Sequence, residues 1–299
     1  MDATSDAGTR PVPTLNELLA LTELGDGEFA AVSIAGSHDR HFGGQFLGQA
    51  IIAAARTVPD GRSIHSMHGY FLRTGDVDGE LSYRVRELRD GRAFSARQVE
   101  AYQGERMLFT MTASFHQPEA GIEHSLPAAT GFPHPETIEH YLREGERRLA
   151  HREILETRRI PPDLAPRGSV GSQAMWFRSR EPVTAPTSSA NRAALALATD
   201  IALLEPVVLR HGATFAYPGL HAASLDHAMW FFDDAPFDEW MLFLQETTWA
   251  GHGRGIARGS IHRLDGSLVA TVQQEGILRF PAEDLVRLAD LASHEGELS

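Results

Sequence analysis

The hydropathy pattern is dominated by the stretch Gly43–Val58, GGQFLGQAIIAAARTV, which is apolar around nearly its whole circumference when drawn as a helix. A helix of this kind is buried on most of its sides. It is too short and too polar at both ends to cross a bilayer, which needs about 20 apolar residues. A second stretch of the same character, Ala190–Leu204, runs up to Pro206. The pattern therefore predicts two helices that the rest of the chain surrounds.

Strand-like runs accompany each of these helices and are separated by turn residues such as Asp90–Gly91. In the first half these runs are Glu28–Ile34, Ser63–Arg73, Leu81–Arg89, Phe94–Tyr102 and Glu105–His116. In the second half they are Arg152–Ile160, Gln173–Arg180, Ala222–Phe232, Trp240–Trp249, Arg254–Arg263 and Ser267–Arg279. A long helix followed by an antiparallel meander predicts, in each half, a sheet that curls around one helix.

The second half repeats the first. His68-Gly-Tyr-Phe-Leu can be laid over His227-Ala-Met-Trp-Phe, and Phe94-Ser-Ala-Arg97 over Gly255-Ile-Ala-Arg258. A repeat of about half the chain length indicates two copies of one fold side by side. On this alignment His68 and His227 are equivalent, and we expect both to be structural.

The predicted organisation follows from these patterns. Residues 1–13 are polar and expected to be disordered, and Thr14 begins a helix over LNELLALTEL with a capping box to Glu17. We expect one folded unit over residues 14–117, a linker with a charged helix at about Pro135–His151 over residues 118–151, a second unit over residues 152–283, and a tail over residues 284–299.

Composition excludes several classes of protein. The chain of 299 residues has no cysteine and a formal net charge of -13, which argues against disulfides, zinc–thiolate sites, a cysteine nucleophile and general nucleic-acid binding. No secretory signal or peroxisomal address is visible, so we expect a cytoplasmic protein without membrane insertion. His65 and His68 point to opposite faces of a strand, and no metal or other cofactor is predicted.

Several blocks in a fixed order resemble the acyl-CoA thioesterase II family, double-hotdog enzymes that hydrolyse acyl-CoA to fatty acid and coenzyme A. The blocks are Phe42–Ile51, His65–Val77, Leu88–Glu100, Met111–Ile122, Leu225–Phe232 and Gln274–Phe280. The resemblance extends from about Leu15 to Arg279. It implies an α+β double hotdog: two tandem helix-wrapped antiparallel sheets that form an intramolecular pseudo-dimer.

The resemblance also implies a site. In this family a water molecule is the nucleophile, held by an Asp, a Ser or Thr, and a Gln of the second hotdog, which map onto Asp200, Ser224 and Gln274. The start of the first helix would offer backbone N–H groups to the thioester oxygen. We therefore expect the substrate-binding residues to be Gly43, Gly44, Gln45 and His65.

The residue types fit this chemistry. Asp200 lies in LALATDIALL, without a cationic neighbour on either flank. A buried carboxylate without partners costs several kcal/mol or takes up a proton, so the alternative is a helix residue that reaches solvent. A hydroxyl and an amide from neighbouring strands would instead make Asp200 a base for water. The chain has no G-x-S-x-G, so a nucleophile elbow is unsupported.

Two other functions remain open at this point. A hotdog-fold 3-hydroxyacyl-thioester hydratase or dehydratase needs a catalytic His or acid at the helix start, where His41 is the only candidate and stands in place of an apolar residue expected from the resemblance. A non-catalytic acyl-CoA-binding protein would not need Asp200, Ser224 and Gln274 together. In each case the partner is acyl-CoA, and we expect a homo-oligomer, a dimer or tetramer of double hotdogs.

Overall fold

The computed structural model describes residues 12–34, 41–125, 127–139, 151–166, 172–184 and 189–296. Most of the segment expected to be disordered, residues 1–13, lies outside these residues, as does most of the expected charged helix. The helices are α1 (Leu15–Leu19), α2 (Gly43–Ala55), α3 (His151–Ile154), α4 (Ala190–Thr199), α5 (Glu205–Leu209) and α6 (Leu285–Gly296), with short 3-10 turns at Pro135–Thr137 and Ala282–Asp284.

All the strands in the described part of the chain belong to one antiparallel sheet. The first half contributes β1 (Thr22–Gly25), β2 (Glu28–Ala31), β3 (Ser63–Phe71), β4 (Leu81–Asp90), β5 (Phe94–Gln103) and β6 (Arg106–His116). The second half contributes β7 (Leu155–Arg159), β8 (Ser172–Ser179), β9 (His221–Ser224), β10 (Asp226–Phe231), β11 (Met241–Gly251), β12 (Arg254–His262) and β13 (Leu268–Arg279). The order is β1-β2-β4-β5-β6-β3-β10-β13-β12-β11-β8-β7, and β9 pairs with β13.

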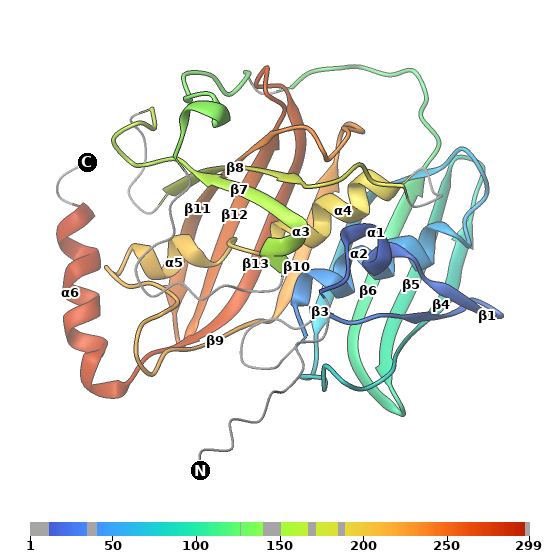
Figure 1. Cartoon of the computed structure of the whole chain (residues 1–299), viewed down its shortest axis with the longest axis horizontal. Helices are drawn as coiled ribbons and strands as arrows, with labels where there is room; N and C mark the ends of the chain where they lie inside the picture. The colour runs from blue at the N-terminus through green and yellow to red at the C-terminus, as the bar shows by residue number, and fades with distance from the viewer. Residues whose placement is uncertain are drawn as a thin grey trace, which may run out of the picture.

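The two apolar helices pack against each other on one side of this sheet (Figure 1). They run antiparallel, because Gly44 of α2 faces the backbone of Leu197 and Gly48 faces that of Ala193. A Cβ at Gly44 would lie only 2.1 Å from the Leu197 carbonyl oxygen, so the close approach requires glycine there. Each half is a helix wrapped by an antiparallel sheet, which confirms the predicted double hotdog.

Four predicted elements are wrong in their extent. The expected strand Arg152–Ile160 is divided into α3 and β7. The expected helix LNELLALTEL is divided into α1 and β1. The second apolar helix ends at Thr199 rather than before Pro206, which lies instead in the first turn of α5, where proline is tolerated because no intrahelical donor is needed. The run Ala222–Phe232 is broken at Leu225 into β9 and β10.

The strand register corrects the alignment of the two halves by one residue. In β3 a bulge lies between Ile64 and Ser66, and in the second half the break between β9 and β10 lies at Leu225. Counted from these points, His227 is equivalent to Met67, and both are buried. His68 is equivalent to Ala228, so the predicted equivalence of His68 and His227 is wrong.

A one-residue correction in the opposite direction separates Arg97 from Arg258. The pairs Glu87–Arg97 and Thr247–Ala257 each precede a bulge, so Arg97 is equivalent to Ala257. Arg97 is fully buried, whereas Arg258 is exposed. A shift of one residue moves a side chain to the opposite face of a sheet, which explains the contrast.

Arg97 ties the C-terminal end of α2 to the sheet. Its guanidinium donates to both carboxylate oxygens of Asp90 at 2.9 and 3.0 Å, and to the backbone oxygen of Thr57 at 2.8 Å. These charge-assisted bonds from Arg97 hold the pKa of Asp90 well below its usual range. The α2 end is thereby satisfied by a buried cation, as the helix dipole favours.

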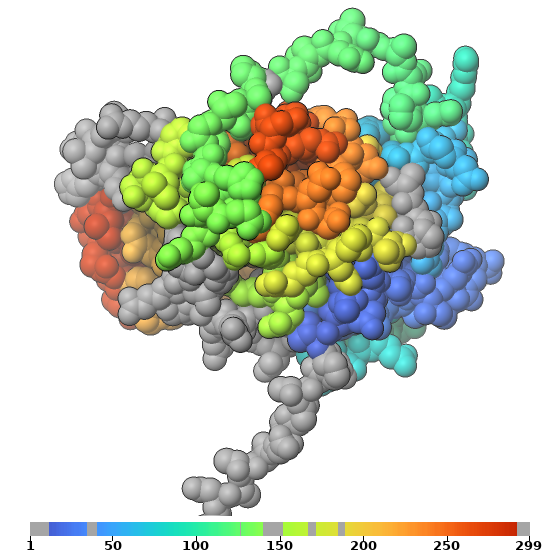
Figure 2. Space-filling model, turned by 45° about the horizontal axis from the view of Figure 1, so that its top comes forward, coloured from blue at the N-terminus to red at the C-terminus, as the bar shows by residue number. Residues whose placement is uncertain are grey.

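The segment that joins the two halves crosses to the second half of the sheet (Figure 2). There the indole N–H of Trp176 donates to the Pro133 carbonyl at 2.9 Å, and that of Trp240 to Glu136 at 3.0 Å. Only a 3-10 turn, Pro135–Thr137, occupies the described start of the expected charged helix. The expected C-terminal tail contains α6. Among the described residues, no helix is long and apolar enough to cross a membrane.

Replacing Arg97 by alanine is expected to lower the free energy of unfolding by about 2 kcal/mol, because Asp90 and the Thr57 carbonyl lose their buried donor. Arg258→Ala is the matched control, since Arg258 forms an exposed ion pair with Glu246, and its effect should be below about 0.5 kcal/mol. Urea denaturation at pH 7 measures both. Equal losses would contradict the one-residue correction of the repeat.

Candidate functional site

The structure brings Asp200, Ser224 and Gln274 into one hydrogen-bonded group. The amide nitrogen of Gln274 donates to Asp200 Oδ1 at 2.8 Å and to Ser224 Oγ at 2.5 Å. The Ser224 hydroxyl donates to the same Asp200 oxygen at 3.3 Å. Three side chains that are far apart in the sequence therefore surround one carboxylate.

Local structure places each member of this group. Asp200 is the C-cap residue of α4, where the helix breaks beside Thr199, whose hydroxyl bonds the Ala196 carbonyl. Ser224 is the last residue of β9, opposite Gly276 of β13. Gln274 precedes Gly276 by two residues, so both face the same side of β13. The helix break and the short strand thus converge on one position of the sheet.

Burial dominates the electrostatics of Asp200. Desolvation raises the pKa of its carboxyl to about 6, while hydrogen bonds from Gln274, Ser224 and the backbone of Gly44 act in the opposite direction. The carboxyl therefore gains and loses its proton close to neutral pH. This is the range in which a carboxylate is most useful as a general base.

The N-terminus of α2 completes the group from the other half of the chain. Besides the bond from Gly44, the ideal Cβ position at Gly43 lies 2.6 Å from Asp200 Oδ2. A side chain at either glycine would displace the carboxylate or α4. The predicted residues Gly43 and Gly44 are therefore beside Asp200, and the site lies between the two hotdogs.

Gln45 and His65 are not brought to this group. Gln45 is fully buried; its oxygen accepts from the Ile34 backbone at 2.7 Å, and its nitrogen contacts His41 Nδ1 at 3.1 Å. It holds the chain that precedes α2. His65 bonds Ser114 at 2.8 Å, and burial followed by the charge of His116 and Arg192 lowers its pKa. Because Arg192 lies at the start of α4 and Asp200 at its end, His65 belongs to the opposite end of that helix.

Sequence reasoning missed His227 as part of the site. Its side chain is fully buried, with Nδ1 3.3 Å from the Gln274 amide oxygen and Nε2 3.1 Å from Thr199 Oγ1. Burial lowers the pKa of His227 to about 4, so the ring is neutral. His227 lies in the block Leu225–Phe232 that carries the family resemblance, and this was the available signal. The alignment that placed His227 over His68 indicated a structural residue instead.

The equivalent position in the first half carries no such group. By the strand register Ile64 corresponds to Ser224, and Ala113 corresponds to Gln274. Both residues are buried and apolar. The duplicated fold therefore has this polar arrangement in one copy only.

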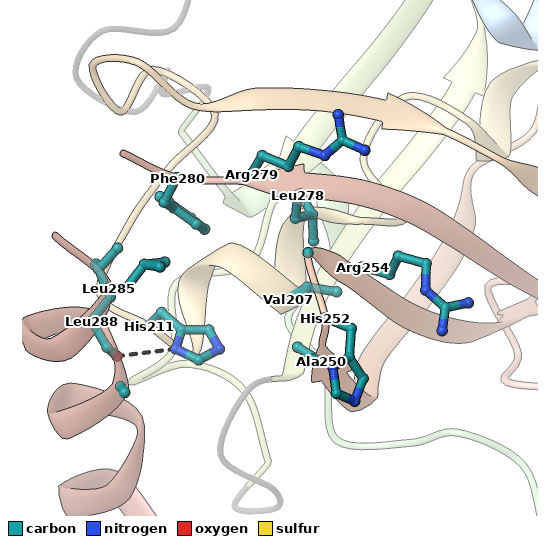
Figure 3. Close-up of a pocket in the computed structure, with 13 residues that line it drawn as sticks. Val207, His211, Ala250, His252, Arg254, Leu278, Arg279, Phe280, Leu285 and Leu288 are labelled. Atoms are coloured by element: carbon teal, nitrogen blue, oxygen red, sulfur yellow. Dashed lines mark hydrogen bonds between the residues drawn. The ribbon is translucent and has the colours of Figure 1, made fainter. Parts of the chain in front are cut away.

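A separate cavity of about 440 Å³ lies between α5, the β11–β12 turn, the end of β13 and α6 (Figure 3). It is lined mainly by apolar side chains, among them Val207, Leu278 and Phe280. Asp200, Ser224 and Gln274 are not among its lining residues. Within the described residues, no group of three or more histidines and acidic side chains is placed to hold a metal ion.

Comparison with protein-family models matches both halves of the chain. Residues 34–116 match the acyl-CoA thioesterase N-terminal domain, and residues 118–278 match the acyl-CoA thioesterase C-terminal domain. The two matches together cover the segment that contains α2, the whole sheet from β3 to β13 and the Asp200 group.

Individual proteins agree with the family models. The chain is 35% identical over 261 residues to acyl-coenzyme A thioesterase 8 of Mus musculus, covering 80% of each chain. It is 33% identical to acyl-CoA thioesterase 2 of Haemophilus influenzae, covering 89% of this chain and 97% of the relative. The crystal structure of an acyl-CoA thioesterase II from Mycobacterium marinum superposes with a TM-score of 0.78 at 35% identity, over 90% of this chain and 99% of that chain. With matching models for both domains, these relatives and the double-hotdog fold, the chain belongs to the acyl-CoA thioesterase family.

Proposed function

We propose that this acyl-CoA thioesterase hydrolyses fatty acyl-CoA with Asp200 as the general base for a water molecule. The observation that carries the proposal is the position of one half-buried carboxylate, with a pKa near 6, between two side-chain donors and the glycine-rich start of α2. Asp200 would accept a proton from water as the oxygen attacks the thioester carbon. Loss of the coenzyme A thiolate then gives the fatty acid.

Ser224 and Gln274 have related tasks in this proposal. Gln274 donates one amide hydrogen to Asp200 and the other to Ser224, so this side chain fixes the carboxylate and the hydroxyl. Ser224 Oγ stands next to the carboxylate and offers an oxygen that orients the attacking water. The role proposed for Gln274 therefore differs from the one expected from the sequence: Gln274 positions Asp200 and Ser224, rather than the water alone.

The start of α2 supports the developing oxyanion. The first N–H groups of a helix have no intrahelical acceptor, and the helix dipole favours negative charge there. Gly44 already donates to Asp200, which leaves the backbone of Gly43 as the nearest proposed donor to the thioester oxygen. Because a thiolate is a good leaving group, the reaction does not require a covalent nucleophile.

The alternatives have less support. The hydratase would use His41, but this ring packs edge-on against Phe46 and contacts Gln45, and burial lowers its pKa. A non-catalytic acyl-CoA-binding protein gives no reason for a half-buried carboxylate with two side-chain donors. The cytoplasmic location stays a prediction from the sequence.

Asp200→Asn and Gln274→Ala are each expected to lower kcat by about 10²-fold or more, because the base is lost or misplaced. Gln273→Ala is the matched control: Gln273 is the adjacent residue of β13, exposed on the opposite face, and should leave kcat unchanged. Thiol release from a panel of acyl-CoA lengths measures the rates. In the wild type, kcat should rise with pH through about 6. Wild-type rates in Asp200→Asn, or an enoyl product without thiol, would refute the proposal.

Asp200→Asn is also expected to stabilise the fold above pH 6. The pKa of Asp200 is higher in the folded protein than its ordinary 3.8, so folding favours the protonated form and native stability falls as pH rises from about 4 to about 6. A neutral amide avoids this loss, which amounts to at most about 3 kcal/mol. Thermal unfolding at pH 8 and pH 4 should show a gain for the variant only at pH 8. An equal gain at both values would contradict the burial of an ionisable group.

We also propose that double hotdogs associate through the outer face of the central strands. Tyr70, Trp230 and Phe232 are 49%, 46% and 56% exposed there, and exposed aromatic groups of this kind mark interfaces. Light scattering should give a dimer or tetramer for the wild type and a smaller mass for Trp230→Glu, with Leu24→Glu as a control at an exposed leucine of β1. A monomeric wild type would exclude this association.

A further inference from the structure

The amide of Gln274 has two possible orientations, and only one of them suits an ionised Asp200. With nitrogen toward Asp200, the amide donates to the carboxylate and to Ser224. Rotated by 180°, it would place its oxygen against the oxygens of both groups, because an amide has one accepting and one donating end. Some neighbour must therefore distinguish the two ends.

His227 is the neighbour of the other end. It lies next to the Ala228–Gln273 pair of β10 and β13, so its side chain stands across from that of Gln274. Its Nδ1 is 3.3 Å from the amide oxygen. A proton on Nδ1 makes this nitrogen a donor. A donor there is compatible only with the amide orientation in which the Gln274 oxygen faces His227.

The two polar neighbours of the imidazole determine where it carries its proton. The Gln274 amide oxygen only accepts, so its contact with Nδ1 is a hydrogen bond when the single proton of the neutral ring lies on Nδ1. The Thr199 hydroxyl lies 2.9 Å from the Ala196 carbonyl and 3.1 Å from Nε2, and it can donate its one proton to either acceptor; with Nδ1 protonated, Nε2 is the acceptor for it. The donors then run in one direction: Thr199 to His227, His227 to Gln274, and Gln274 to Asp200 and Ser224. Asp226 and His68 are the other charged or titratable groups that act on the ring.

The fold itself does not require histidine at this position. In the first hotdog the equivalent residue is Met67, which is buried opposite Ala113, the equivalent of Gln274. A polar ring therefore occurs only in the half where the facing residue is the site amide. A purely structural residue would give no reason for this difference.

We propose that His227 is a positioning residue that fixes the orientation of the Gln274 amide and so keeps Asp200 ionised and correctly aimed. This inference rests on the proposed role of Asp200 as general base. His227 does not touch the reacting atoms and acts through Gln274. Without its donor, the amide would spend time with its oxygen toward Asp200, which raises the pKa of that carboxyl.

Two substitutions separate the donor from the shape of the side chain. His227→Met copies the first hotdog and removes the donor. His227→Asn places an amide nitrogen at the position of Nδ1 and keeps it. We expect His227→Met to lower kcat by about tenfold with KM nearly unchanged, and to move the acid limb of the kcat–pH profile to higher pH. His227→Asn should restore most of kcat and return the acid limb to its wild-type position.

Thr199→Val provides an independent variant, because it removes the donor to Nε2 without altering His227. It should shift the acid limb in the same direction as His227→Met, and it decides the question if His227→Met does not fold, as judged by thermal unfolding. The proposal is overturned if the folded His227→Met or Thr199→Val enzyme keeps the wild-type kcat and acid limb. It is also overturned if His227→Asn is as impaired as His227→Met.

The wild type and Asp200→Asn are assayed in parallel to keep the two proposals apart. If the wild type releases no thiol, or Asp200→Asn releases it at the wild-type rate, the general-base mechanism fails. If both controls behave as expected and the His227 variants do not, only the positioning role of His227 fails.

Discussion

One half-buried carboxylate governs the arrangement around it. Burial of an ionised side chain costs several kcal/mol unless donors replace the lost water. For Asp200 these donors come from β13, from β9 and from the start of α2. The strand break at Leu225, the end of α4 and the glycines of α2 all lie at this point. The strand break, the helix end and the glycines therefore all lie beside the Asp200 carboxylate.

The duplicated fold sets the position of the site, and the residues that differ between the two halves set its chemistry. Two helices of the same kind pack antiparallel, so the end of α4 meets the start of α2. In one half the facing strand positions hold Ile64 and Ala113, and in the other they hold Ser224 and Gln274. Since apolar residues fill these positions in the first half of the same sheet, the fold does not require the polar residues of the second half.

The two hotdogs are joined by direct strand pairing. β3 and β10 pair directly, and His68 bonds Asp226 across them at 3.0 Å. The second carboxylate oxygen of Asp226 accepts from the backbone of Glu275 at 2.8 Å, next to Gln274. A continuous sheet therefore fixes α2 relative to β13, which a site assembled from both halves requires.

The sequence alone determined the two apolar helices, the meanders that wrap them, the duplication, and the grouping of Asp200, Ser224 and Gln274 implied by the family resemblance. These follow from hydrophobic patterns and from blocks of residues in order. Only the tertiary structure decided strand register and helix ends: Met67 rather than His68 matches His227, α4 stops at Asp200, and Gln45 and His65 face away from the carboxylate. The physical reason is that strand side chains alternate with a period of two, so an alignment that is wrong by one residue moves a side chain from the surface to the core, and the correct register is set by pairing with distant strands that local sequence does not specify.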